Sequence, residues 1–142
     1  MIYEFQLSEN FTAYEARCRG EECCCHGAVR ADRQLVMVLQ HLRELWQEPI
    51  TVTSWFRCDE YNREVEGHPR SFHRLGMAAD LTSREIRNAL RSEDGASFCK
   101  DIEGVLVGVV GDSHGNIFYY PERNFIHVDV GHLTGTPRIR RK

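Results

Sequence analysis

Hydrophobic positions recur with helical spacing in one long segment of the first half of the chain. Between Ala28 and Gln47, apolar residues return every three or four positions, and charged or amide side chains occupy the other faces. Pro49 follows, and its ring excludes a continuing helix. The pattern predicts a helix over residues 28–47 with one buried face, formed by Leu35, Val38, Leu39, Leu42, Leu45 and Trp46.

Alternating and β-branched segments predict strands in the rest of the chain. Residues 50–54 alternate apolar and polar side chains, which is typical of a strand with one buried face. The glycine-punctuated apolar run 104–110 predicts a buried strand, and residues 111–116 have the composition of a turn. Two more strands are expected over residues 116–120 and 125–130, the first of them pairing with the run 104–110 as a hairpin.

A second, shorter helix is expected to begin after Leu81. Thr82 and Glu85 have the spacing of a capping box, and Ile86 and Leu90 belong to a short apolar stripe. The chain would then run helix, strand, helix and an antiparallel meander. This order predicts an α+β fold, in which the helices pack on one side of a single antiparallel sheet.

Composition and charge narrow the classes of protein. With 142 residues, 42% of them hydrophobic and 27% charged, residues 1–142 are expected to form one globular domain. The net charge of −3 argues against a nucleic-acid partner. The chain shows neither a signal-peptide pattern nor an apolar stretch approaching the roughly 18 residues that cross a bilayer. We expect a monomer made in the cytoplasm without a signal peptide, and not embedded in a membrane.

Clustered cysteines leave two interpretations open. Cys18, Cys23, Cys24 and Cys25 are followed by His26, and together they could form a structural metal site. Adjacent cysteines cannot easily all point at one ion, however, and no second CxxC pair is present. The spacing therefore favours reduced thiols near the surface, with one disulfide forming after release of the protein. The basic tail, residues 138–142, is expected to be a solvated end.

The segment from Ser71 to Leu81 places His73 and Asp80 seven residues apart. Zinc bonds of about 2.0–2.2 Å require the donor atoms to lie close together. Two turns of helix would separate the pair by roughly 10 Å, and a straight strand would place it on opposite faces. His73 and Asp80 can therefore meet at one ion only if the chain bends between them, which Gly76 permits.

The segment from Asn124 to Gly131 alternates like a strand, with His127 and Asp129 on one face and apolar residues on the other. If this strand pairs with the strand that ends at Asp80, the spacing of roughly 5 Å between strands brings His127 to the same ion. Two histidines and one aspartate leave a fourth position for water, which distinguishes a catalytic zinc site from a structural one.

Together these segments resemble the M15 family of zinc peptidases. That family includes D-alanyl-D-alanine carboxypeptidases, dipeptidases and phage endolysins, and it shares its fold with the Hedgehog signalling domain. The opening, residues 7–12, also resembles the phage and prophage branch. The resemblance rests on Thr53-Ser54-Trp55-Phe56-Arg57, Tyr61-Asn62, Ser71-x-His73-x-x-Gly76-x-Ala78-x-Asp80 and Phe125-Ile126-His127-Val128-Asp129.

The resemblance implies a role for each matching residue. His73, Asp80 and His127 would be the ligands of a Zn²⁺ ion, and Arg57 would clamp a carboxylate of the substrate during catalysis. A guanidinium binds a carboxylate through two parallel hydrogen bonds, as this role requires. Ser71 would line the same pocket as a hydrogen-bonding group.

One position departs from the family pattern. Many members carry Glu or Asp three residues before the last histidine, as the general base that activates the attacking water, whereas this chain has Asn124. An amide takes up no proton at neutral pH. Asp129 is the first candidate for the base, and it is equally suited to orienting a histidine ligand. Glu122 is a weaker candidate, and His132 is expected to be a surface residue.

The function expected from the resemblance is zinc-dependent hydrolysis of a peptide bond in bacterial peptidoglycan. The enzyme would act as a D-Ala-D-Ala carboxypeptidase or as an endopeptidase on stem peptides or cross-links. The sequence shows no wall-binding module and no signal. We therefore expect a phage or prophage lysis protein that another factor releases to the wall. The alternatives are a non-catalytic zinc-containing domain that binds wall peptides or a protein, and a redox or metal sensor built on the cysteines.

Overall fold

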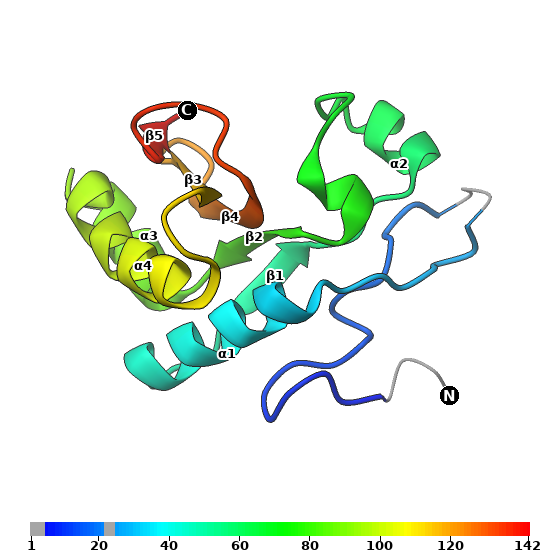
Figure 1. Ribbon diagram of the computed structural model, residues 1–142, viewed down its shortest axis with the longest axis horizontal. Coiled ribbons are helices and arrows are strands. Elements are labelled where there is room, and N and C mark those ends of the chain that lie inside the picture. Colours follow the sequence, from blue (N-terminus) through cyan, green and yellow to red (C-terminus); the bar gives the residue numbers. More distant parts are fainter. Residues whose placement is uncertain (1–4, 22–24) are drawn as a thin grey trace.

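The computed structural model describes residues 5–21 and 25–142 of the chain (Figure 1). It contains helices and strands in mixed order around one five-stranded sheet, so the predicted α+β class is confirmed. In chain order the elements are α1 (Arg33–Trp46), β1 (Thr51–Ser54), α2 (Asp59–Glu64), the 3₁₀ turn η2 (Phe72–Leu75), β2 (Ala78–Thr82), α3 (Arg84–Arg91), α4 (Gly95–Val110), β3 (His114–Tyr120), β4 (Phe125–His132) and β5 (Ile139–Arg141).

The strands lie in the order β1-β2-β4-β3-β5. All pairs are antiparallel except β3 and β5, which run parallel, so the prediction of a purely antiparallel sheet is corrected. The reason lies at the end of β4, where His132 pairs with His114, the first residue of β3. A chain that turns at this end and continues along the free edge of β3 must run in the same direction as β3.

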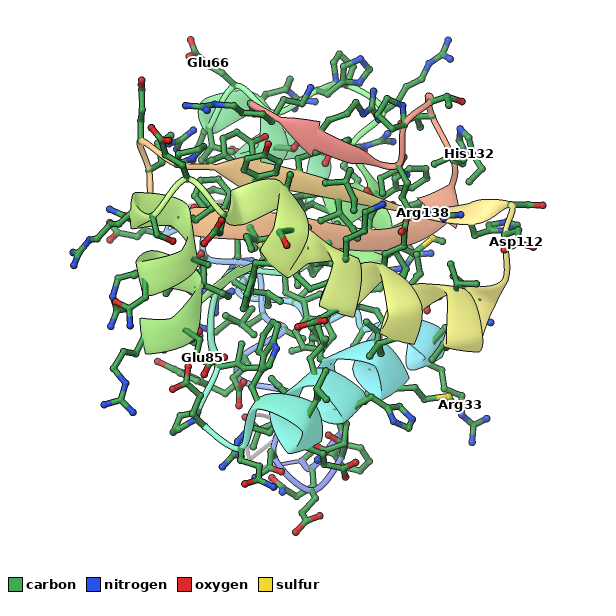
Figure 2. All side chains as sticks on the ribbon, turned by 90° about the vertical axis from the view of Figure 1, so that its left-hand side faces the viewer. Arg33, Glu66, Glu85, Asp112, His132 and Arg138 are labelled. Carbon is green, nitrogen blue, oxygen red and sulfur yellow. The ribbon has the colours of Figure 1, made fainter. Side chains whose placement is uncertain are left out.

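Helices α1, α3 and α4 cover one face of the sheet, as predicted (Figure 1). The β4 residues Ile126, Val128 and Val130 point into the core beneath these helices. Because side chains alternate along a strand, the residues between them point to the opposite face. That face carries the polar site, and Figure 2 shows Glu66 on the side of the sheet away from α1.

Helix α1 begins at Arg33 rather than at residue 28, because Asp32 caps it. The Asp32 carboxylate accepts hydrogen bonds from the amides of Gln34 and Leu35. Most of the predicted buried face is confirmed, but Leu45 is 55% exposed. In α3 the cap is Ser83 rather than the predicted Thr82, since the Ser83 hydroxyl accepts from the amide of Ile86.

The predicted strand over residues 104–110 is wrong, because this segment forms the second half of α4. The buried residues Cys99, Ile102 and Leu106 have helical spacing, whereas a Cβ added at Gly104 or Gly108 would meet no atom within 4 Å. An apolar run alone does not distinguish a strand from a buried helix. The hairpin of the sheet is instead formed by β3 and β4.

Among the residues that the structure describes, none of the helices is both long enough and apolar enough to cross a membrane.

Candidate metal centre

Three side chains that the sequence singled out meet on the polar face of the sheet. His73 comes from η2, Asp80 from β2 and His127 from β4, and their ligand atoms lie within 4.8 Å of one another. His73 Nε2 and His127 Nδ1 each lie 3.2 Å from Asp80 Oδ1. All three residues are buried. The structure therefore brings together the donor set His₂Asp, which we call the His–Asp cluster.

A bend and a strand pairing produce this convergence. Gly76 ends η2 with a φ of +70°, which is the bend that the sequence required between His73 and Asp80. At the other end of the turn, the Ser71 hydroxyl accepts a hydrogen bond from the amide of His73. Strand β2 then pairs with β4 so that Asp80 and His127 are direct partners.

The orientation of His73 is fixed by the backbone of Trp55. His73 Nδ1 lies 2.6 Å from the Trp55 carbonyl oxygen, which can only accept a hydrogen bond. Nδ1 therefore carries the proton, and in the neutral ring Nε2 presents its lone pair to Asp80. A histidine that binds a metal usually makes such a hydrogen bond through its other ring nitrogen.

A chain of hydrogen bonds fixes the orientation of His127 in the same way. The amide N–H of Thr134 donates to Asn116 Oδ1, so Asn116 Nδ2 faces Asp129 Oδ1 and donates to it at 2.8 Å. The other oxygen of Asp129 lies 2.7 Å from His127 Nε2 and accepts from it. The neutral ring of His127 therefore presents the lone pair of Nδ1 to Asp80.

The donor atoms of the His–Asp cluster would repel one another unless a positive charge lay among them. Two imidazole lone pairs and a carboxylate oxygen face one another, and all are electron donors. Burial opposes a charge on His127, but its hydrogen bonds to Asp129 and Asp80 raise its pKa to about 9. Burial alone would raise the pKa of Asp80, yet the neighbouring His73 and His127 hold it well below its usual range. A zinc ion fits this donor set and would replace the proton.

Arg57 lies at the free oxygen of the central carboxylate. Its guanidinium donates to Asp80 Oδ2 at 3.2 Å and to the Ser54 hydroxyl at 3.0 Å. The carboxylate thus faces the imidazoles with one oxygen and Arg57 with the other. The remaining guanidinium surface borders an open cleft.

The His–Asp cluster opens into a cleft of about 870 Å³. Ser71 and His132 also line it, whereas neither Asn124 nor Glu122 is among the lining residues that the structure describes. The basic side chains along the walls are Arg57, Arg70, Arg123, Arg140 and Lys142. These five cationic side chains outnumber the three carboxylates of the described lining, Glu66, Asp80 and Asp129, so the cleft favours ligands that carry negative charge.

The basic tail is part of the cleft rather than a solvated end. Phe118 stacks on His127 with ring centroids 4.9 Å apart, and Arg140 and Lys142 lie 4.6 and 4.7 Å from the centroid of Phe118. Just before β5, Arg138 donates to the carbonyl of Asp112, which follows the end of α4 (Figure 2). Strand β5 therefore holds the basic tail in place as one wall of the cleft.

Sequence reasoning missed Asn116 and Phe118, which support His127 from the neighbouring strand. The sequence signal that could have identified them is the alternation of side chains along β3, which places both residues on the face opposite Ile117. A correct pairing of β3 with β4 would have placed Phe118 beside His127.

Replacing Asp129 with Asn is expected to weaken zinc binding roughly 10–100-fold without unfolding the chain. Asn116 and the amide of Gly131 both donate to Asp129 Oδ1, so an asparagine would keep its oxygen there and turn its NH₂ toward His127. The proton of His127 would then move to Nδ1, the nitrogen that faces Asp80. Zinc affinity would be measured by competition with a chromophoric chelator, and Asp101→Asn, on the exposed face of α4, is the matched control. Equal affinities for the two variants would contradict this role.

A family model described as Peptidase M15 matches residues 9–129, a range that includes the whole His–Asp cluster and ends before β5. Neither the curated proteins nor the solved structures gave a match. The match covers most of the chain and agrees with the converging histidines and aspartate, so the chain belongs to the peptidase M15 family.

Proposed function

We propose that this peptidase is zinc-dependent and hydrolyses a peptide bond in bacterial peptidoglycan. The supporting observation is the convergence of His73 Nε2, Asp80 Oδ1 and His127 Nδ1 beside an open cleft. A zinc ion bound there supplies Lewis acidity, which polarises a peptide carbonyl and activates water. In the hydrolysis, the C–N bond breaks, the water oxygen stays on the carboxylate product and the amine leaves with a proton.

The residues around the cluster have separate roles in this proposal. His73, Asp80 and His127 hold the metal, and the Trp55 carbonyl fixes the ring of His73. The sequence left two roles open for Asp129. Both of its oxygens are engaged in hydrogen bonds, which supports the role of orienting His127 over that of a base.

The charge of the cleft supports peptidoglycan as the substrate. Stem peptides end in a carboxylate and carry further free carboxylates, and five basic side chains line the cleft. A guanidinium near the cluster is suited to binding such a group, which would hold the scissile carbonyl beside the His–Asp cluster. Arg57 is the guanidinium that contacts the cluster directly.

Replacing Arg57 with Lys is expected to lower kcat/KM roughly 10–100-fold, mainly through KM. Lysine keeps the charge but loses the planar fork, and a hydrogen bond to a charged group contributes about 1.5–3 kcal/mol. Steady-state kinetics on a stem peptide would measure the effect, with Arg91→Lys at the exposed end of α3 as the matched control. An unchanged KM for Arg57→Lys would argue against carboxylate binding by this residue.

The test of the proposed function is turnover of purified muropeptides, followed by mass spectrometry with and without a chelator. Chelator-sensitive loss of one D-alanine would identify a carboxypeptidase, whereas separated stem peptides would identify an endopeptidase. Zinc content would be measured on the same samples. Bound zinc without product from any muropeptide would overturn the proposal.

That outcome would favour the second candidate, a non-catalytic domain that binds wall peptides. Its supporting observation is Asn124, which occupies the position of the expected base. Asn124 lies in the turn between β3 and β4 with a φ of +57°, and its carbonyl accepts a hydrogen bond from the Thr82 hydroxyl. This binding domain would keep the metal and the basic cleft but would lack the proton acceptor.

A further inference from the structure

A second group of side chains that could hold a metal ion is separate from the His–Asp cluster. The ligand atoms of Cys18, Cys25 and Cys58 all lie within 4.8 Å of one another. Cys18 is buried, and the other two are partly buried. The sequence offered no second cysteine pair to complete a metal site with the first cluster, but folding brings Cys58 to it from the start of α2.

The spacing of the sulfur atoms matches a shared metal ion. Cys18 Sγ and Cys58 Sγ lie 3.7 Å apart. Tetrahedral zinc with Zn–S bonds of about 2.3 Å places neighbouring sulfur atoms about 3.8 Å apart. A disulfide would bring two of the sulfur atoms to about 2.05 Å and leave the third outside the bond.

The backbone presents the sulfur atom of Cys58 in a way that suits a thiolate ligand. Cys58 is the N-cap of α2, and its Sγ accepts a hydrogen bond from the amide of Tyr61 at 3.4 Å. Cys25 begins a tight turn in which His26 and Gly27 both have positive φ, and the amide of Ala28 closes the turn onto the Cys25 carbonyl. Hydrogen bonds and a nearby cation both favour the charged form of a cysteine.

The N-terminal segment has little regular secondary structure of its own. Within the described residues, positions 5–21 and 25–31 contain no helix or named strand, and two isolated bridges are their only strand-like pairings. One of these bridges, between Arg17 and Val29, joins the two ends of the segment that carries Cys18 and Cys25.

We propose that Cys18, Cys25 and Cys58 bind a second, structural zinc ion through three of its four tetrahedral positions, and that this ion fastens the N-terminal segment to α2. Cys23 and Cys24 lie outside the described residues, and the proposed site includes neither. The site is separate from the His–Asp cluster but is coupled to the cleft through the backbone. Cys58 directly follows Arg57, which holds the central carboxylate of the cluster. The structural zinc thus fixes the backbone from which Arg57 reaches Asp80.

The first measurement is the zinc content of the reduced full chain, purified without a metal-affinity resin. We expect about two zinc ions per chain, one for each set of ligands. Cys58→Ser and His73→Ala should each remove about one ion, and the double variant should remove both. Cys99→Ser is the matched control, because Cys99 is buried in α4 and belongs to neither site. The control should keep the full zinc content.

A second measurement detects the thiolate ligands directly in the wild-type chain. Cobalt(II) bound to the wild-type chain should give strong thiolate-to-metal absorption in the near ultraviolet, which histidine and aspartate ligands do not produce. The His73→Ala chain should keep this absorption, which separates the two sites.

Three results would overturn the proposal. They are the absence of thiolate absorption in the cobalt-loaded chain, a Cys58→Ser chain that keeps all of its zinc, and a Cys18–Cys58 disulfide in the freshly purified protein. None of these results bears on muropeptide turnover, so the proposed function and the second zinc site fail independently.

Discussion

A His73→Ala chain is expected to lose peptidase activity and the metal of the His–Asp cluster. His73 Nε2 is one of three donor atoms that face one another, and the cluster then keeps only two protein ligands. Removing a residue that merely orients a ligand costs roughly 10–100-fold in affinity or activity, so loss of a direct ligand should exceed that range. Zinc content and turnover of muropeptides measure the two effects in the same preparation.

The control for this prediction is His41→Ala, which removes an exposed imidazole from α1. It should keep the activity and zinc content of the original chain. Circular dichroism of His73→Ala would verify that the chain is folded. A folded His73→Ala chain with undiminished activity would show that the catalytic centre lies elsewhere.

A Gly76→Ala chain is expected to lose about 3 kcal/mol of folding free energy, and with it the geometry of the cluster. The φ of +70° at this position strains any side chain, by roughly 1–3 kcal/mol. An added Cβ would also collide with the carbonyl oxygen of Arg30, a backbone atom that cannot rotate away. Because Gly76 makes the bend between His73 and Asp80, relief of the collision would move the two ligands apart.

Gly104→Ala is the matched control for this substitution. Gly104 lies inside α4, and an added Cβ would meet no atom within 4 Å, so alanine should stabilise the chain by about 0.5–1 kcal/mol. Thermal and urea unfolding of both variants would compare the free energies. If Gly76→Ala were as stable as Gly104→Ala, the left-handed bend would not be required.

The residues of the His–Asp cluster were predictable because the sequence signals that mark each of them are local. Gly76 signals the bend, and the alternation of residues 124–131 places His127 on a polar face. Pairing the strands at Asp80 and His127 then required only the standard spacing of a sheet. Both histidines and the aspartate meet as expected.

The parts that sequence reasoning missed depend on contacts between distant segments. The Trp55 carbonyl is a backbone group, and no residue type marks it as the partner of His73. Cys58 joins the other cysteines only after α2 has packed beside the N-terminal segment. The position of β5 depends on the turn after His132, whose direction is not encoded by an apolar pattern.

The direct pairing of Asp80 with His127 also has a kinetic consequence. Both α3 and α4 lie between these residues in the chain, so the pair can form only after that long segment has closed into a loop. Contacts this distant in sequence are slow to form and are completed late in folding. A metal that needs the assembled cluster therefore binds the native state rather than the transition state that precedes it. A metal bound in this way would slow unfolding, would leave the folding rate nearly unchanged and would thus prolong the lifetime of the folded protein.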